Sequence, residues 1–341
     1  MPASQRLLLW FLALLLPLLA AAGLVWGSVT LPLSDVWAAF CQGGADSAAY
    51  VVVVESRLPS VLTAGLAGMA LAAAGLVMQT VFQNPLADPS ILGVGAGSGL
   101  GVAVVVLWLG GSLTMGTELL GGFLLTLTGA VVGAGAVLAL LAALSVWLPG
   151  RLHLLVAGVM VSFLAGALTG MLSFFASAEG VQRYVVWGLG SFDMLSLPRV
   201  EWLATVVAVS VFGLLLRVKS LDALLLGADY AAVLGFSVQR ERTWLLLLAG
   251  VLTAVVTACC GPVSFVGLAV PALVRLWYPT ADTHRVWLPV CLLAGADVAL
   301  LCHLLCHIAG LWWGILPIGV VTPLIGAPVV IVYLLRNSIN S

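Results

Sequence analysis

The stretch that decides the fold runs from Leu58 to Gly101 and reads LPSVLTAGLAGMALAAAGLVMQTVF, QNPLADPSIL and GVGAGSGLG. Two apolar spans meet there at a polar segment, residues 84–90, which we call the elbow. Pro85 and Pro89 lack a backbone donor and disfavour helix in the residue before them, so Asn84 and Asp88 are expected in turn-like backbone. Because polar backbone in a membrane needs partners or water, we expect the elbow to be covered or hydrated.

The composition is that of a membrane protein. Of the 341 residues, 63% are hydrophobic and 7% are charged, and the mean hydropathy is +1.23. Soluble domains have roughly 25% charged residues. About 20 helical residues cross a bilayer core of about 30 Å, and most of the apolar runs are that long. Since the runs do not alternate with period two, we predict an all-α polytopic protein and not a β-barrel.

Breaks at Gly, Pro and charged residues predict ten helices in a single transmembrane domain, residues 1–341. The eighth is short and contains Pro271, so it is expected to be broken or only partly inserted. The ten ranges are 7–25, 58–82, 91–109, 119–147, 152–175, 200–218, 243–259, 265–277, 286–309 and 318–335.

Arginine and lysine set the orientation, because positively charged loops stay in the cytoplasm. With both termini inside, nine of the twelve basic residues fall on the cytoplasmic side; only Arg57, Arg183 and Arg199 fall outside. Residues 7–22 are also compatible with a secretory signal, but the run exceeds the usual core of ~7–15 residues and its loss would leave nine helices. We therefore predict a multi-pass membrane protein with both termini in the cytoplasm.

Two spans carry stripes of small residues. Gly158, Ser162, Gly166 and Gly170 share one face of the fifth span, and Gly93, Gly97 and Gly101 form a row in the third. Small residues let helices pack closely in lipid. The alternative is that they line a path for a solute.

A cytoplasmic insert at residues 220–241 interrupts the membrane pattern. Ser220 is expected to cap a first short helix that ends at Gly227, and a second helix, 230–234, ends at Gly235. Its apolar residues predict either a docking site for another protein or packing beneath the chain's own helices. The chain has no G-x-x-x-x-G-K-[ST] motif, so ATP, if it drives the protein, binds to a partner.

Polar residues are rare inside the predicted spans. His303 and His307 lie one helical turn apart in the ninth span and can ligate a metal ion or haem iron, although two residues leave a zinc site short of ligands. The alternative is polar packing between helices. Asp297 is a functional candidate because a carboxylate is costly in lipid. The alternative is that its carboxyl group is neutral and hydrogen bonded. The six cysteines suggest no disulfide framework, and no basic patch indicates nucleic-acid binding.

Five motifs in order make the chain resemble the permease subunit of bacterial ABC importers for iron-siderophores, haem and vitamin B12. They are R-L-P at 57–59, N-P-L-A-D-P followed by L-G-V-x-x-G at 84–97, L-G-x-x-x-A-x-x-L-G at 226–235, G-P-V-S-F-V-G-L-A-V-P at 261–271 and L-P-I-G-V-V-T-x-L-I-G-A-P at 316–328.

The resemblance implies a location in the bacterial inner membrane and a homodimer with the path on its axis. It also implies two cytoplasmic subunits that bind ATP and Mg, and a soluble binding protein outside. This chain would bind no cofactor and catalyse no reaction. Arg57 would dock the binding protein, although a second family arginine is Ser60 here, and His307 would stand in for another. The residues implied to couple to the ATPase are Leu221, Leu226, Gly227, Ala231, Leu234 and Gly235.

The predicted function is import of a metal chelate by alternating access, with the elbow in the inner gate. An ion-coupled secondary transporter is the alternative, with Asp297 as its one candidate ion ligand. An intramembrane hydrolase lacks a nucleophile and base. The predicted gate and path residues are Asn84, Pro85, Leu86, Asp88, Pro89, Gly93, Gly158, Ser162 and Gly166.

Overall fold

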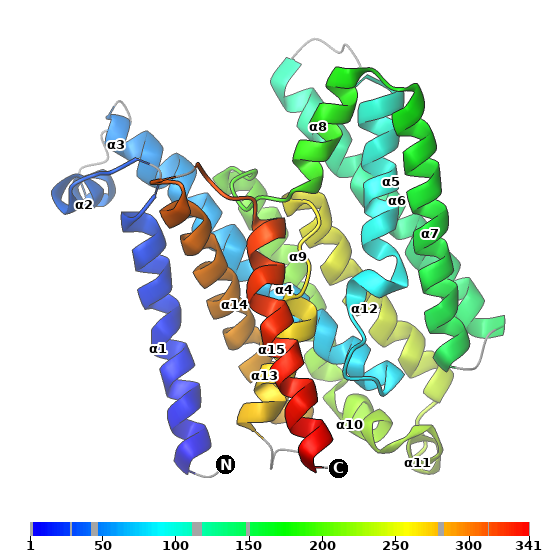
Figure 1. The fold of residues 1–341 in the computed structure, drawn as a ribbon. Helices are drawn as coiled ribbons and strands as arrows, with labels where there is room; N and C mark the ends of the chain where they lie inside the picture. Colours follow the sequence, from blue (N-terminus) through cyan, green and yellow to red (C-terminus); the bar gives the residue numbers. More distant parts are fainter. Residues whose placement is uncertain are drawn as a thin grey trace. The chain divides into compact units, whose positions relative to one another are not determined.

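The computed structural model describes residues 3–27, 29–41, 47–110, 118–147, 151–278, 283–312 and 314–340, which form helices and connecting segments with no strand among them. Figure 1 labels the α-helices. They are α1 (Ala3–Val25), α2 (Leu33–Cys41), α3 (Ala48–Tyr50), α4 (Leu58–Phe82), α5 (Val94–Ala103), α6 (Glu118–Trp147), α7 (Arg151–Phe175), α8 (Ala178–Gly188), α9 (Leu197–Leu216), α10 (Val218–Leu226), α11 (Ala228–Val233), α12 (Val238–Cys260), α13 (Val266–Trp277), α14 (His284–Ala309) and α15 (Ile318–Asn340). Two π-helical segments, η1 (Val51–Arg57) and η3 (Val104–Trp108), extend α4 and α5, and η2 (Pro89–Leu92) is a 3-10 turn.

The ten predicted spans match ten apolar helical segments. Within the described ranges, eight are long and apolar enough to cross a membrane, and Val94–Trp108 and Val266–Trp277 are shorter. The prediction that Pro271 breaks the eighth span is wrong, because α13 continues through Pro271. Its shortness has another origin: residues 261–264 before it are not helical, and Phe265 takes a left-handed φ of 70°. The sequence did not predict α2, α3 and α8, which are too short to span a bilayer.

The described chain folds as two compact units that are interleaved in sequence. Unit 1 comprises residues 1–73, 191–208 and 263–341, and unit 2 comprises residues 74–190 and 209–262. The chain passes from one unit to the other within α4 and again within α9. The predicted single domain covering residues 1–341 stays a prediction.

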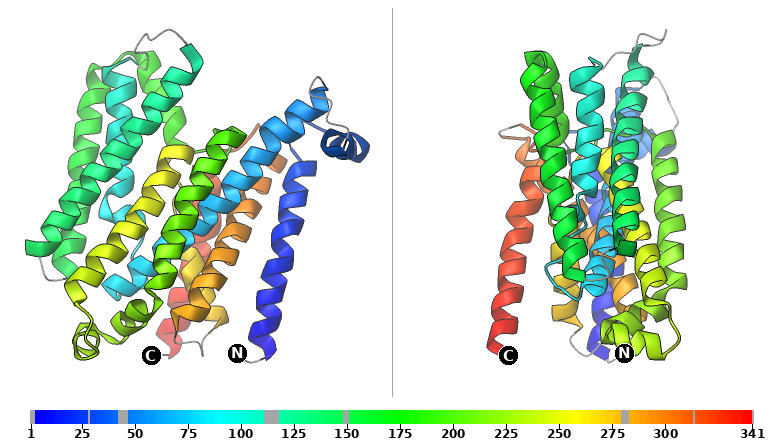
Figure 2. Two further views of the ribbon diagram at one scale, coloured as in Figure 1. Left: turned by 180° about the vertical axis from the view of Figure 1, so that it is seen from behind. Right: turned by 90° about the vertical axis from the view of Figure 1, so that its right-hand side faces the viewer.

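In unit 1, α1 and α15 flank α13 and α14, and α1 lies beside α14 (Figures 1 and 2). Gly68 of α4 meets Gly295 of α14 so closely that a Cβ on either residue would overlap the other's backbone carbonyl. Gly326 of α15 likewise leaves room for Phe265, since a Cβ there would lie 2.6 Å from the Phe265 Cβ. Close backbone approach therefore holds these helices together, as expected in lipid.

In unit 2, α5 packs against α6 through small residues on both helices. A Cβ on Gly101 would overlap the Gly129 carbonyl oxygen. A Cβ on Gly97 would lie 2.6 Å from the Gly133 carbonyl oxygen. The packing interpretation of the third-span stripe is thus confirmed for these two positions. The matching pair on α6, spaced four residues apart, was missed, although the small-x-x-x-small spacing is readable in the sequence.

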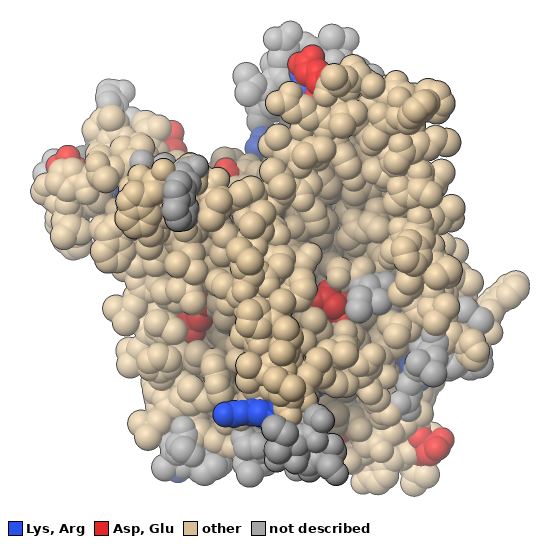
Figure 3. All heavy atoms as spheres, in the orientation of Figure 1, with Lys and Arg blue, Asp and Glu red and all other residues tan. Residues whose placement is uncertain are grey.

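Large apolar side chains cover much of the exposed surface. On α7, Phe163, Phe174 and Phe175 are exposed. Figure 3 shows one face on which charged residues are few and broad areas carry none. Such a surface suits contact with lipid or with another apolar protein surface.

Candidate functional site

The elbow is a locally satisfied polar turn. After α4 ends, Gln83 adopts a left-handed φ of 48°. The Asn84 Oδ1 accepts a hydrogen bond from the Leu86 N–H at 2.9 Å. The Asp88 Oδ1 accepts two from Ser90, from its N–H at 2.7 Å and its hydroxyl at 2.6 Å, and so caps η2. The predicted turn conformations of Asn84 and Asp88 are therefore confirmed.

The side chains of the elbow differ in their exposure to solvent. Pro89 is buried and Pro85 half-buried, whereas the Leu86 side chain is exposed. Burial raises the pKa of the Asp88 carboxyl, and the hydrogen bonds from Ser90 act in the opposite direction. The elbow thus presents an apolar side chain beside a carboxyl group that is held in place by its own loop.

A hydrogen bond joins Gln83, the residue before the elbow, to the insert. The Gln83 Nε2 donates to the carbonyl oxygen of Leu224 in α10 at 3.0 Å. Gln83 was not among the predicted site residues, and the signal that pointed to it was weak: a glutamine between the end of an apolar helix and the Asn-Pro turn. Both segments belong to unit 2, so their proximity is a property of that unit.

Gly93 connects the elbow to the fifth-span stripe. It adopts a φ of 79° at the start of α5, where a Cβ would lie 3.0 Å from the Ser162 Oγ and 3.1 Å from the Gly158 carbonyl oxygen of α7. The Ser162 hydroxyl donates to that same carbonyl at 3.0 Å. Gly166 and Gly170, in contrast, are exposed with open space at the Cβ position. The stripe therefore divides into a packed half and an exposed half.

The insert forms two short helices, as predicted, with different details. Gly227 at φ 123° separates α10 from α11, and Gly235 at φ 86° follows α11. The predicted Ser220 cap is wrong, because α10 begins at Val218 and the Ser220 hydroxyl donates to the Arg217 carbonyl at 2.9 Å. Arg217 also pairs with Glu241 of α12 at 2.5 Å, which fixes the start of α10 to that helix.

The apolar residues of the insert are divided between its two faces. Three of them, Leu221, Leu224 and Ala231, are buried beneath the insert. For these the structure favours packing against the chain's own helices, so Leu221 and Ala231 offer no contact surface to a partner. Leu226, Val233 and Leu234 are exposed, Val233 at 86%. We call these three residues the insert ridge, and Figure 1 shows α10 and α11 beside each other near one end of α12.

Arg57 does not present a free guanidinium. The residue is only 8% exposed, and its side chain donates to the carbonyl oxygens of Leu24 and Val25 at 2.8 Å each, and to that of Val29. These groups lie at and beyond the C-terminal end of α1, where helix carbonyls lack intrahelical partners. Arg57 therefore caps the C-terminal end of α1. This geometry does not support the docking role that the resemblance implied.

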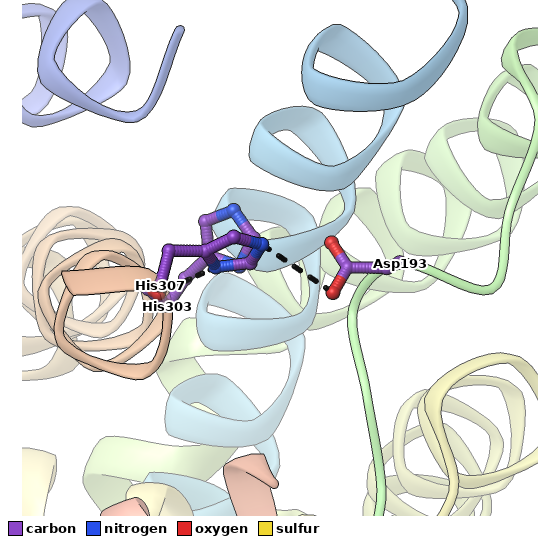
Figure 4. Close-up of side chains that lie close together, drawn as sticks. All are labelled: Asp193, His303 and His307. Atoms are coloured by element: carbon purple, nitrogen blue, oxygen red, sulfur yellow. Dashed lines mark hydrogen bonds and ion pairs between the residues drawn. The ribbon is translucent and has the colours of Figure 1, made fainter. Parts of the chain in front are cut away.

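His303 and His307 are joined by a third residue in unit 1. Their rings lie 4.3 Å apart between centroids, and the Asp193 Oδ2 lies 3.6 Å from the His307 Nε2. Figure 4 shows Asp193 reaching the pair from the segment that precedes α9. One ligand atom from each of the three lies within 4.8 Å of the others. The sequence did not indicate Asp193, because it is a single loop carboxylate 110 residues before His303.

Asp297 lies six residues before His303 in α14 and is 4% exposed. Neither of its carboxyl oxygens has a hydrogen-bond partner among the described residues. The interpretation of Asp297 as a hydrogen-bonded group is therefore not supported. A buried carboxyl without a partner costs folding free energy unless it is protonated or gains one in another state.

Comparison with known proteins places the chain. The FecCD transport family matches residues 13–336. The chain is 32% identical to the hemin transport system permease protein HmuU of Yersinia pestis, covering 98% of this chain and 97% of that protein. It is 35% identical to the ferric enterobactin permease FepG of Escherichia coli (98% of each chain) and to the vitamin B12 permease BtuC of Serratia proteamaculans (90% and 88%).

A solved structure agrees with these relatives. It is described as an inward-facing conformation of a metal-chelate type ABC transporter; its TM-score is 0.79, its identity is 28%, and the match covers 97% of this chain and 99% of that one. These findings confirm the prediction that the chain is part of an ABC importer and do not support the alternative, an ion-coupled secondary transporter. They also confirm a transport subunit that is no enzyme and that works with ATP-binding subunits and a substrate-binding protein. The chain belongs to the FecCD transport family and is a permease subunit of an ABC importer.

Proposed function

We propose that two copies of this chain form the path by which a metal chelate of the haem, ferric siderophore or cobalamin class enters the cytoplasm. The observation that carries the proposal is the match of the whole chain to permeases named for such ligands. These ligands are bulky, so they need a wide conduit with few strong contacts. Scarce charge and abundant small residues within the spans suit that conduit.

ATP and Mg bind to the separate ATPase subunits, which dock on the insert ridge. The exposed Leu226, Val233 and Leu234 supply the apolar contact, and Gly227 and Gly235 set the angles of the two helices. The buried Leu221 and Ala231 serve this contact indirectly, by holding α10 and α11 in place. A docking site on rigid helices transmits motion better than one on a mobile loop.

The elbow is the inner gate of this permease. The hydrogen bond from Gln83 to Leu224 supports this, because it connects the insert to the first residue after α4. Motion of α10 then moves the elbow residues Asn84 to Ser90 together with Gly93. It also moves the packed half of the fifth-span stripe on α7, Gly158 and Ser162. Nucleotide binding selects between two arrangements of these elements.

The exposed half of the fifth-span stripe on α7 faces the partner protomer or the conduit. Gly166 and Gly170 are exposed and have no neighbouring atom at the Cβ position within the described chain. Small exposed residues on a helix with exposed phenylalanines provide close approach for a second apolar surface. This is the support for a homodimer with its path at the interface.

The charge bias supports an inner-membrane protein with both termini and the insert in the cytoplasm. The His303–His307 end of α14 then faces the outside. The Gly23 Cβ position lies 3.9 Å from the His303 ring, so this end is also the C-terminal end of α1. We retain His307 as a docking residue for the binding protein on this face and assign Arg57 to the structure of α1.

Reconstitution tests the proposal. The permease is placed in proteoliposomes with its ATPase, and uptake of haemin, a ferric siderophore and cyanocobalamin is measured with each cognate binding protein. We expect ATP-dependent uptake of one class, abolished when the ATPase nucleotide lysine is replaced. Uptake that follows an ion gradient without ATP, or ATP-dependent uptake of none of the three classes, would contradict it.

A further inference from the structure

The cluster of Asp193, His303 and His307 has the composition of a metal centre (Figure 4). Two imidazoles and one carboxylate provide three ligands of the kind that hold zinc or iron(II) with coordination positions left open. Magnesium and calcium prefer oxygen ligands, so two histidines select against them.

The separation of the His307 Nε2 from the Asp193 Oδ2 fits a shared ion better than a direct hydrogen bond. The His307 Nε2 and Asp193 Oδ2 are 3.6 Å apart, which is too long for a hydrogen bond. Two atoms that are each about 2.0–2.1 Å from a tetrahedral ion lie about 3.3–3.4 Å from each other. A small movement of the Asp193 loop therefore brings the pair to the required distance.

The His307 ring is already oriented for ligation. Its Nδ1 lies 3.0 Å from the His303 carbonyl oxygen, so the Nδ1–H donates to that carbonyl. A proton on Nδ1 leaves the Nε2 lone pair free, and Nε2 is the atom that faces Asp193. The second ligand of the pair, His303, is fixed by the spacing of four residues on α14.

His303 is held by packing, and Asp193 is held by a hydrogen bond. His303 is only 5% exposed and packs against Phe192, with ring centroids 6.1 Å apart. The Ser191 hydroxyl lies 3.2 Å from the Asp193 Oδ2 and donates to it, so the carboxylate has a positioning partner. Asp193 is exposed, which leaves the site open to solvent on one side. The buried His303, the half-buried His307 and the exposed Asp193 together allow an ion to enter from solvent and to keep a further ligand.

We propose that Asp193, His303 and His307 bind a divalent transition cation, zinc or iron(II) in class, with at least one coordination position open. The site is independent of the chelate proposed as the transported ligand. It requires neither the partner subunits nor transport, so it can be tested on the purified permease alone.

The test is a titration of the tag-free, detergent-solubilised permease with Co²⁺ as the probe, followed by its visible d–d absorption, with Zn²⁺ as competitor. We expect one equivalent of Co²⁺ to bind and Zn²⁺ to displace it. Asp193→Asn, His303→Ala and His307→Ala should each weaken binding by at least ~10–100-fold. His153→Ala, which removes a histidine outside the cluster, should leave binding unchanged.

Two further variants keep the result interpretable. Asp193→His supplies a third imidazole and should restore binding that Asp193→Asn loses. Cys306→Ala removes the nearby thiol and should leave the spectrum unchanged. Monodispersity on gel filtration shows that each variant is folded.

Three outcomes would overturn the site. They are absence of Co²⁺ binding by the folded wild-type permease at micromolar protein, binding that survives all three ligand replacements, and binding that is lost only with Cys306. If the first outcome comes with ligation of haemin iron by the two histidines, the pair is assigned to the haem metal and not to a three-residue cation site.

Discussion

The side-chain amide of Gln83 donates a hydrogen bond to the carbonyl oxygen of Leu224 at 3.0 Å, 141 positions later in the chain. It is a direct connection between the residue that links α4 to the elbow and the helix α10, which carries part of the insert ridge. A single hydrogen bond contributes little to stability, but this one lies where motion of the insert must reach the elbow.

Replacing Gln83 should separate ATP hydrolysis from transport. In Gln83→Ala we expect transport per ATP hydrolysed to fall about 2–10-fold, which is the effect of losing one net hydrogen bond of about 0.5–1.5 kcal/mol. Uptake and phosphate release are measured in the same proteoliposomes. Gln182→Ala, at an exposed position of α8, is the matched control. An unchanged ratio in Gln83→Ala would mean that the bond does not couple the two segments.

The insert ridge should bind the ATPase through apolar contact. We expect Val233→Asp or Leu226→Asp to weaken association with the ATPase subunit by at least ~30-fold, since central apolar contacts are each worth about 2 kcal/mol or more. Association is measured by co-purification and by titration in detergent. Ser237→Asp adds the same charge at an exposed position that begins α12 and should have little effect. Equal losses in all three variants would point to charge and not to the ridge.

The close contact between α5 and α6 should tolerate no side chain larger than hydrogen. Gly101→Ala places a methyl group on the Gly129 carbonyl, so we expect a loss of about 1–3 kcal/mol from overpacking. The readout is the temperature at which the detergent-solubilised protein leaves its gel-filtration peak. Gly95→Ala is the control, because open space surrounds its Cβ position. Equal melting of the two variants would contradict the packing argument.

Arg57 should matter for stability more than for docking. Arg57→Gln leaves carbonyls at the end of α1 without donors, so we expect a loss of about 1–3 kcal/mol. Arg57→Lys should recover part of it. The exposed Arg183, paired with Glu179 one turn away, is the control; Arg183→Gln should cost less than ~1 kcal/mol. A stable Arg57→Gln protein with weakened binding-protein affinity would restore the docking role.

The local chemistry of the chain predicted much of this fold. Apolar length and the Gly and Pro breaks predicted all ten apolar segments. The end of α4 at Phe82 agrees with the prediction, whereas η1 extends the helix by seven residues before the predicted start at Leu58. Proline predicted the turns at Asn84 and Asp88, and glycine predicted the separation of α10 from α11. Each of these outcomes depends on residues only a few positions apart, and backbone sterics act over that range.

What the sequence by itself determined, then, is a ten-segment helical membrane protein with a polar elbow, a two-helix insert and a pair of histidines one turn apart. Only the tertiary structure decided that Leu221 and Ala231 are buried, that Arg57 bonds to the end of α1, and that Asp193 joins His303 and His307. The physical reason is that a membrane helix is apolar on all sides, so hydropathy does not distinguish its lipid-facing side from its packed side. Contacts between residues more than a hundred positions apart, such as Asp193 with His307, depend on how the helices pack, and that is set by the fold as a whole.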